Sequence, residues 1–87
     1  MRFALDLSRE AEKELEKVDR ATLKRLQTRI EEVLEDPFST RFSKSMTTVA
    51  GARISRVGNW RILFEVDEEK DLVKILAIRP RSKAYRK

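Results

Sequence analysis

The sequence predicts an α+β fold in which two helices pack on one face of an antiparallel sheet, with the elements in the order βααβββ. Its 87 residues suffice for one hydrophobic core, so residues 1–87 are expected to form a single domain. Apolar residues recur at helical spacing in the first half and alternate with polar residues in the second half. Helices followed by strands are typical of α+β domains.

The first strand and the first helix are predicted at the N-terminus. Residues 2–7 alternate large apolar with small or polar side chains, which is typical of a half-buried strand. Ser8 is a suitable N-cap for an amphipathic helix that ends near Val18. The outer faces of this helix and of the next carry mixed charges and are expected to be solvated.

A second helix is predicted after Asp19, which can serve as its N-cap. Its apolar residues form a single stripe. They are Leu23, Leu26, Ile30, Val33 and Leu34. The helix is expected to end at Asp36, because a residue that precedes proline is disfavoured in the helical conformation. Residues 38–47 are rich in Ser, Thr and basic residues and are predicted to form a loop.

Three strands are predicted in the second half of the chain. Residues 49–57 and 60–67 flank Gly58-Asn59, which is a signal for a tight hairpin with a two-residue loop. A charged turn at residues 68–71 then leads into a last strand at residues 72–79. These strands complete the βααβββ order.

The composition limits both the chemistry and the location of the protein. The chain has no cysteine and no histidine, so proton transfer must use Lys, Arg, Tyr or carboxylate side chains, and we expect neither a metal nor a cofactor. Residues 1–7 lack the apolar core of a signal peptide, and no run of about 20 apolar residues could span a membrane. These features favour a cytoplasmic protein with no membrane partner.

The net charge of +5 is concentrated in two segments of the chain. Residues 37–64 carry five basic and no acidic side chains, and residues 79–87 also carry five basic and no acidic ones. Such segregation predicts a surface that faces a polyanion. The alternative is a solvated basic face that serves only solubility.

Two arginines are predicted to face each other across the hairpin. If Gly58 and Asn59 form its loop, Arg56 lies opposite Arg61 on the sheet face away from the helices. Like charges in this position repel each other, which favours a phosphate site, although both side chains could instead splay into solvent. A three- or five-residue turn before the last strand would bring Arg79 to the same face.

The C-terminal segment is a basic tail with an aromatic residue. Pro80 ends the last strand, and the residues that follow include Arg81, Lys83, Arg86 and the only tyrosine, Tyr85. Among cations, this ring could stack on a base, or its hydroxyl could accept a proton if the positive charge lowers its pKa. The alternative is an aromatic anchor that ties the tail to the body of the domain.

Three segments carry a resemblance to a known family. They are the hairpin at residues 56–67, the strand at residues 73–78 and the ending from Arg79 to Tyr85. They resemble the RelE branch of the RelE/ParE toxins, particularly its archaeal members. The length and the βααβββ order are similar as well, so the resemblance covers the whole chain.

The resemblance implies the toxin of a type II toxin–antitoxin system. Such toxins cleave messenger RNA in the ribosomal A site, by attack of a ribose 2′-OH on the adjacent phosphate, and a cognate antitoxin neutralises them. The family's catalytic residues fall on Arg56, Arg61, Arg79 and Tyr85. Further RNA contacts are expected from Arg53, Arg81, Lys83 and Arg86.

One position departs from the family. Bacterial relatives carry two basic residues spaced by one on the second strand, but Ile54 stands two residues before Arg56, and Arg53 is one step out of phase. Either a β-bulge brings Arg53 round to the face of Arg56, or the second basic group is missing.

Two other functions fit the same sequence. ParE relatives share the fold and inhibit DNA gyrase by binding, and a non-catalytic basic module would bind RNA or DNA without cutting it. Fold alone cannot separate these functions. The combination of Arg61, Arg79 and Tyr85 favours RNA cleavage.

Overall fold

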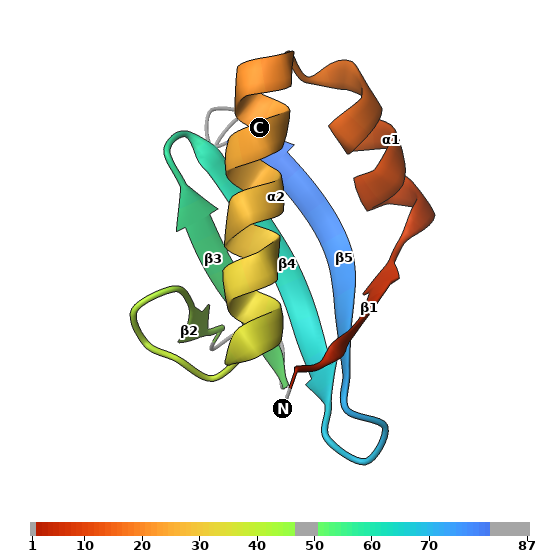
Figure 1. The fold of residues 1–87 in the computed structure, drawn as a ribbon, viewed down its shortest axis with the longest axis vertical. Coiled ribbons are helices and arrows are strands. Elements are labelled where there is room, and N and C mark those ends of the chain that lie inside the picture. Colours follow the sequence, from red (N-terminus) through yellow and green to blue (C-terminus); the bar gives the residue numbers. More distant parts are fainter. Residues whose placement is uncertain (1, 47–50, 81–87) are drawn as a thin grey trace.

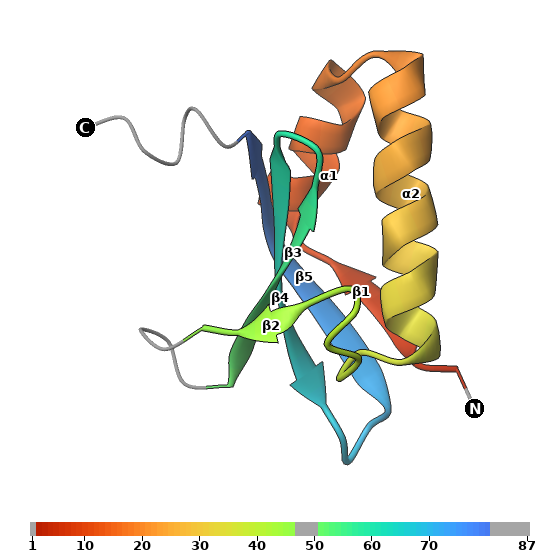
Figure 2. The same ribbon diagram turned by 90° about the vertical axis from the view of Figure 1, so that its left-hand side faces the viewer.

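Two helices cover one face of a five-stranded sheet (Figure 1, Figure 2). The structure is a computed structural model and describes residues 2–46 and 51–80. The helices are α1 (Arg9–Lys17) and α2 (Arg20–Glu35). The strands are β1 (Ala4–Leu7), β2 (Lys44–Ser45), β3 (Ala52–Val57), β4 (Trp60–Asp67) and β5 (Leu72–Pro80). They lie in the order β1-β5-β4-β3-β2, and the predicted α+β class is confirmed.

Both helices begin at their predicted caps. The Ser8 hydroxyl accepts a hydrogen bond from the backbone N–H of Ala11 at 3.1 Å and donates one to the carbonyl oxygen of Leu76 in β5 at 2.7 Å. The backbone carbonyl of Asp19 accepts a hydrogen bond from the N–H of Leu23 at 2.9 Å, while the Asp19 side chain makes no capping bond. Ser8 therefore both starts α1 and fastens it to the sheet.

We expect Ser8→Ala to lower the free energy of unfolding by about 1 to 2 kcal/mol. The substitution removes the cap of α1 and deprives the Leu76 carbonyl of its side-chain donor. Urea denaturation followed by circular dichroism measures the change. Ser8→Thr keeps a hydroxyl at this place and should lose much less. Equal stability of the wild type and Ser8→Ala would contradict a stabilising role for this hydroxyl.

The hydrophobic core lies between the helices and the covered face of the sheet. Helix α2 contributes four buried residues of the predicted stripe. They are Leu26, Ile30, Val33 and Leu34. From β4, Ile62 and Phe64 are fully buried, which confirms the predicted alternation along this strand. Neither helix in the described ranges is long and apolar enough to cross a membrane.

Two features of the sheet differ from the prediction. Strand β1 pairs with β5 in parallel, with Leu7 beside Ile75, so the sheet is mixed rather than wholly antiparallel. The loop predicted at residues 38–47 contains β2, which pairs antiparallel with Arg53 and Ile54. Alternation along a strand indicates which face is buried, but it does not indicate the direction of a neighbouring strand. A strand as short as β2 leaves no periodic pattern in the sequence.

The predicted hairpin is present between β3 and β4. Val57 pairs with Trp60, so Gly58 and Asn59 form the two-residue loop. Gly58 has a φ of 58°, and Asn59 has no positive φ, which is the pattern of a type II′ turn. Strand β3 begins later than predicted, at residue 52, because a glycine with a φ of 81° precedes it. Residues 49 and 50 of the predicted strand lie outside the described ranges.

Candidate active site

Three arginines occupy adjoining positions on neighbouring strands. Arg56 of β3 pairs with Arg61 of β4, and Arg61 pairs in turn with Arg79 of β5. The adjacent pair, Val57 and Trp60, packs against the helix-covered core, so the three arginines lie on the open face of the sheet. We call them the arginine row. Neighbouring strands are about 4.8 Å apart, so the row spans about 10 Å, within which long side chains can converge on one phosphate.

The three members of the row differ in exposure. Arg56 and Arg79 are exposed, whereas Arg61 is half-buried and its Nε is shielded from solvent. Electrostatic interactions become stronger where water is excluded. Arg61 is therefore both the central member of the row and the one best placed to hold an anion tightly.

A β-bulge in β5 aligns Arg79 with Arg61. The turn before β5 has four residues, 68–71, so a turn of three or five residues is wrong. An even loop alone would leave Arg61 opposite Ile78. The register shifts where β5 carries one extra residue, Leu76, and this insertion places Arg79 directly beside Arg61, on the predicted face.

Arg79 also contacts a carboxylate of the first helix. Its Nε and Nη2 donate to one oxygen of Glu10, Oε2, at 3.2 and 3.0 Å. The side chains are 53% and 54% exposed, so the pair contributes little to stability. Sequence reasoning missed this contact, because the two residues are 69 positions apart and meet only where α1 starts beside β5.

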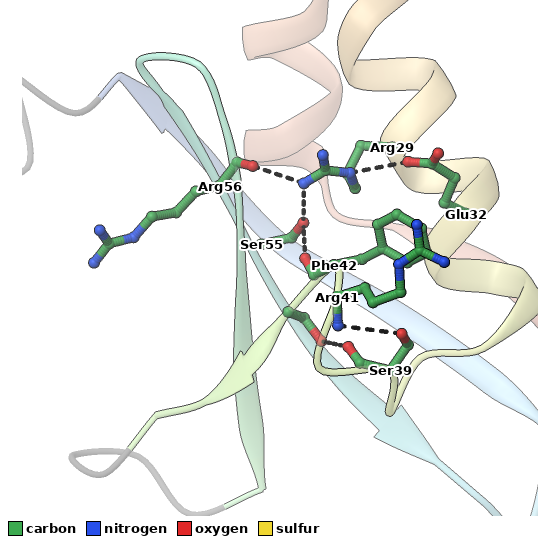
Figure 3. A network of polar contacts seen from close by, with 8 residues as sticks. Arg29, Glu32, Ser39, Arg41, Phe42, Ser55 and Arg56 are labelled. Carbon is green, nitrogen blue, oxygen red and sulfur yellow. Dashed lines mark hydrogen bonds and ion pairs between the residues drawn. The ribbon is translucent and has the colours of Figure 1, made fainter.

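Arg29 of α2 fixes the backbone behind Arg56 (Figure 3). Its Nη1 donates to the carbonyl oxygen of Arg56 at 2.6 Å and to the hydroxyl of Ser55 at 3.0 Å. Its Nε donates to Glu32 at 3.0 Å, and its guanidinium lies 5.4 Å from the ring centre of Phe42. Figure 3 shows the Arg56 side chain pointing away from this network. Helix α2 thus holds the strand from which Arg56 projects, a role not predicted for a charged residue on a helix.

Arg53 lies on the face opposite to the arginine row. Strand β3 pairs regularly with β4 along its whole length, so the predicted alternative of a bulge is wrong. The Nε of Arg53 donates to the Ser43 hydroxyl at 3.0 Å, and its guanidinium lies 5.6 Å from the ring centre of Phe38. Ile54 stands where bacterial relatives carry a second basic group, and it is buried. An RNA contact through Arg53 would therefore use a different surface.

Four predicted site residues lie outside the described residues, namely Arg81, Lys83, Tyr85 and Arg86. Across residues 2–46 and 51–80, no group of His, Cys, Asp and Glu is suited to hold a metal ion. The guanidiniums of the arginine row stay protonated in proteins, so they can bind phosphate oxygens but cannot accept a proton.

The sequence matches the family model of the ParE toxin of type II toxin–antitoxin systems, parDE, over residues 5–85. This match covers both helices, the strands apart from the first residue of β1, and the predicted tail as far as Tyr85. No curated protein matches the chain at the level of sequence.

Solved structures of RelE toxins have the same fold. The toxin–antitoxin complex RelBE2 from Mycobacterium tuberculosis gives a TM-score of 0.77 at 23% identity, covering 93% of this chain and 100% of that one. The archaeal RelE–RelB complex from Pyrococcus horikoshii gives 0.78 at 20% identity, covering 95% and 99%. The isolated E. coli RelE toxin gives 0.79 at 21% identity, covering 90% and 83%.

The family predicted from the hairpin and the ending of the sequence is thus confirmed over nearly the whole chain. The fold agrees with it independently. The chain belongs to the ParE toxin family of type II toxin–antitoxin systems, within the RelE/ParE superfamily.

Proposed function

We propose that this chain is a RelE-type toxin, an endoribonuclease that cleaves messenger RNA in the A site of the ribosome. The observation that carries the proposal is the arginine row on the open face of the sheet. Directly opposed like charges destabilise a sheet unless an anion lies between them. The guanidinium fork matches two oxygens of a phosphate, which makes the phosphodiester backbone of RNA the fitting anion.

Cleavage by the 2′-OH of the substrate requires two proton transfers and the stabilisation of negative charge, three tasks for the active site. The hydroxyl must lose its proton, the extra negative charge on phosphorus must be stabilised, and the leaving 5′-oxygen must gain a proton. Arg61 and Arg79 suit the second task, with Arg56 completing the row. Tyr85, or the ribosomal RNA, is proposed for proton transfer. Because the substrate supplies its own nucleophile, the reaction needs neither a metal-activated water nor a cofactor.

The proposed partners are the ribosome, the messenger RNA and a cognate antitoxin in the cytoplasm. The solved relatives from Mycobacterium tuberculosis and Pyrococcus horikoshii are complexes with antitoxins. Segregated positive charge on this chain suits an acidic antitoxin segment that covers the arginine row or displaces the tail. The product of the neighbouring gene should therefore stabilise the purified chain and suppress its activity. A neighbour that does neither is not the antitoxin.

Primer extension on a translated messenger tests the proposal. Adding the wild-type chain should produce cuts in phase with the codons, only when ribosomes are present, and the cuts should fade with Arg61→Ala, Arg79→Ala and Tyr85→Phe. The family model favours one rival specifically, a ParE-type inhibitor of gyrase. Absence of cuts together with inhibited supercoiling would establish that rival. RNA binding that weakens uniformly with each lost charge, without cuts, would indicate a non-catalytic module.

A further inference from the structure

We infer that Glu10 is the general base of the cleavage reaction, which accepts the proton of the attacking 2′-OH. The inference rests on the proposed function and supplies the group that the arginine row lacks. Guanidiniums remain protonated and cannot take up this proton. A carboxylate can, and Glu10 brings one into hydrogen-bond contact with Arg79, a member of the row.

The contact leaves both partners free to act on RNA. Nε and Nη2 of Arg79 both donate to Oε2 of Glu10, at 3.2 and 3.0 Å. The guanidinium carries five N–H donors, so Nη1 and the second hydrogen of Nη2 can still bind two oxygens of a phosphate. Oε1 of Glu10 accepts no hydrogen bond from Arg79, nor from any other group within residues 2–46 and 51–80. The side chain is also accessible, with 54% of its surface exposed.

This arrangement places the carboxylate beside the nucleophile. A phosphate on one edge of the Arg79 guanidinium and Glu10 on the adjoining edge are held next to each other. In RNA, the attacking 2′-oxygen is attached to the ribose directly next to the scissile phosphate. A general base must come within hydrogen-bond reach of the proton that it removes. A carboxylate next to the bound phosphate meets this condition.

The proposed step is balanced in atoms and charge. Oε1 of Glu10 takes the proton of the 2′-OH, and the 2′-oxygen forms a bond to phosphorus. The bond from phosphorus to the 5′-oxygen breaks, and this oxygen takes a proton from Tyr85 or the ribosomal RNA, the groups proposed above for proton transfer. Glu10 then releases its proton to solvent, from which that donor is protonated again. The products are a 2′,3′-cyclic phosphate and a 5′-hydroxyl end. Attack and departure occur on opposite sides of phosphorus, so Glu10 serves only the attacking side.

Glu10→Gln tests the inference, because the amide oxygen can still accept from Arg79 but the side chain cannot take up a proton. We expect its single-turnover cleavage rate on saturated ribosomes to fall by about 100-fold, a typical contribution of a general base. Its affinity for ribosomes that hold a 2′-O-methylated messenger should not fall, because the substitution removes a negative charge beside the phosphate site. Glu12→Gln, in the same exposed first turn of α1, is the matched control and should cleave at the wild-type rate.

A second substrate distinguishes a general base from a general acid as the role of Glu10. A 5′-thio leaving group departs without protonation, so Glu10→Gln should remain slow on this substrate. Full recovery there would overturn the inference, because Glu10 would then act on the leaving group. If Glu10→Gln cleaves as fast as the wild type, the contact between Glu10 and Arg79 is only an ion pair. If it cleaves faster, Glu10 competes with the phosphate for Arg79. Either outcome overturns the inference alone, whereas a wild-type chain that makes no cuts overturns the proposed function as well.

Discussion

Arg61→Ala should lower the single-turnover rate of messenger cleavage on the ribosome by about 100- to 1000-fold, the range seen when one donor to a transition-state oxyanion is lost. Arg61 stands between Arg56 and Arg79, and its Nε is shielded from solvent. In the proposed reaction, a guanidinium at this half-buried position would stabilise the developing charge of the phosphorane with less screening by water than an exposed one. Rates measured with saturating toxin, beside thermal melting of the purified variant, separate lost chemistry from lost folding.

Lys74→Ala is the matched control for Arg61→Ala, because it also removes one positive charge from the open face of the sheet. Lys74 lies on the open face of β5, where it pairs with Glu65, several residues from the arginine row. Lys74 is half-buried, as Arg61 is. Its removal should change the rate by less than about threefold, because salt screens the interaction between charges that lie well apart near the surface. Arg61→Lys keeps the positive charge but loses the paired N–H donors of the guanidinium, so its rate should lie between those of Arg61→Ala and Lys74→Ala. Equal losses for Arg61→Ala and Lys74→Ala would mean that the row supplies only general positive charge.

Phe64→Ala should lower the free energy of unfolding by about 3 to 5 kcal/mol. Phe64 has no exposed surface and lies in the core between the sheet and the helices. At about 0.05 to 0.15 kcal/mol per residue, a chain of this length has only about 4 to 13 kcal/mol in total. The variant should therefore unfold at a much lower urea concentration, or require a bound partner to fold.

Phe38→Ala is the control for this substitution, since Phe38 is 44% exposed. Its ring contacts the guanidinium of Arg53, which contributes about 0.5 to 1 kcal/mol at an exposed site. A loss below about 1 kcal/mol is expected in urea denaturation. If both variants lose the same stability, the effect arises in the unfolded state rather than from burial of Phe64.

The hairpin explains why much of the site was predictable from the sequence. A two-residue loop fixes which residues face each other, so Gly58-Asn59 is enough to place Arg56 opposite Arg61. Apolar periodicity is likewise enough to assign the covered faces of α2 and β4, because each element buries one side. These two facts place Arg56 and Arg61 together on the open face, whereas the place of Arg79 in the row depends on the β-bulge in β5.

The contacts that support the arginine row could not be predicted from any local pattern in the sequence. The bulge at Leu76 adds one residue whose presence depends on how β4 and β5 pair, not on a signal within β5. Arg29 and Glu10 lie on helix surfaces where charged residues are ordinarily solvated, and their partners are far away in the sequence. Only the packing of the helices on the sheet brings these side chains to the site.

The strand order determines how late during synthesis of the chain the site can form. Strand β5 is the last of the described elements along the chain, yet it lies inside the sheet, between β1 and β4. Strand β1 has no neighbour, and Arg61 has no Arg79 beside it, until residues 72–80 have been synthesised. The nascent chain therefore has no assembled site while these residues are still being added. An antitoxin that is already present can therefore bind the toxin while it first folds, before the proposed cleavage of messenger RNA can begin.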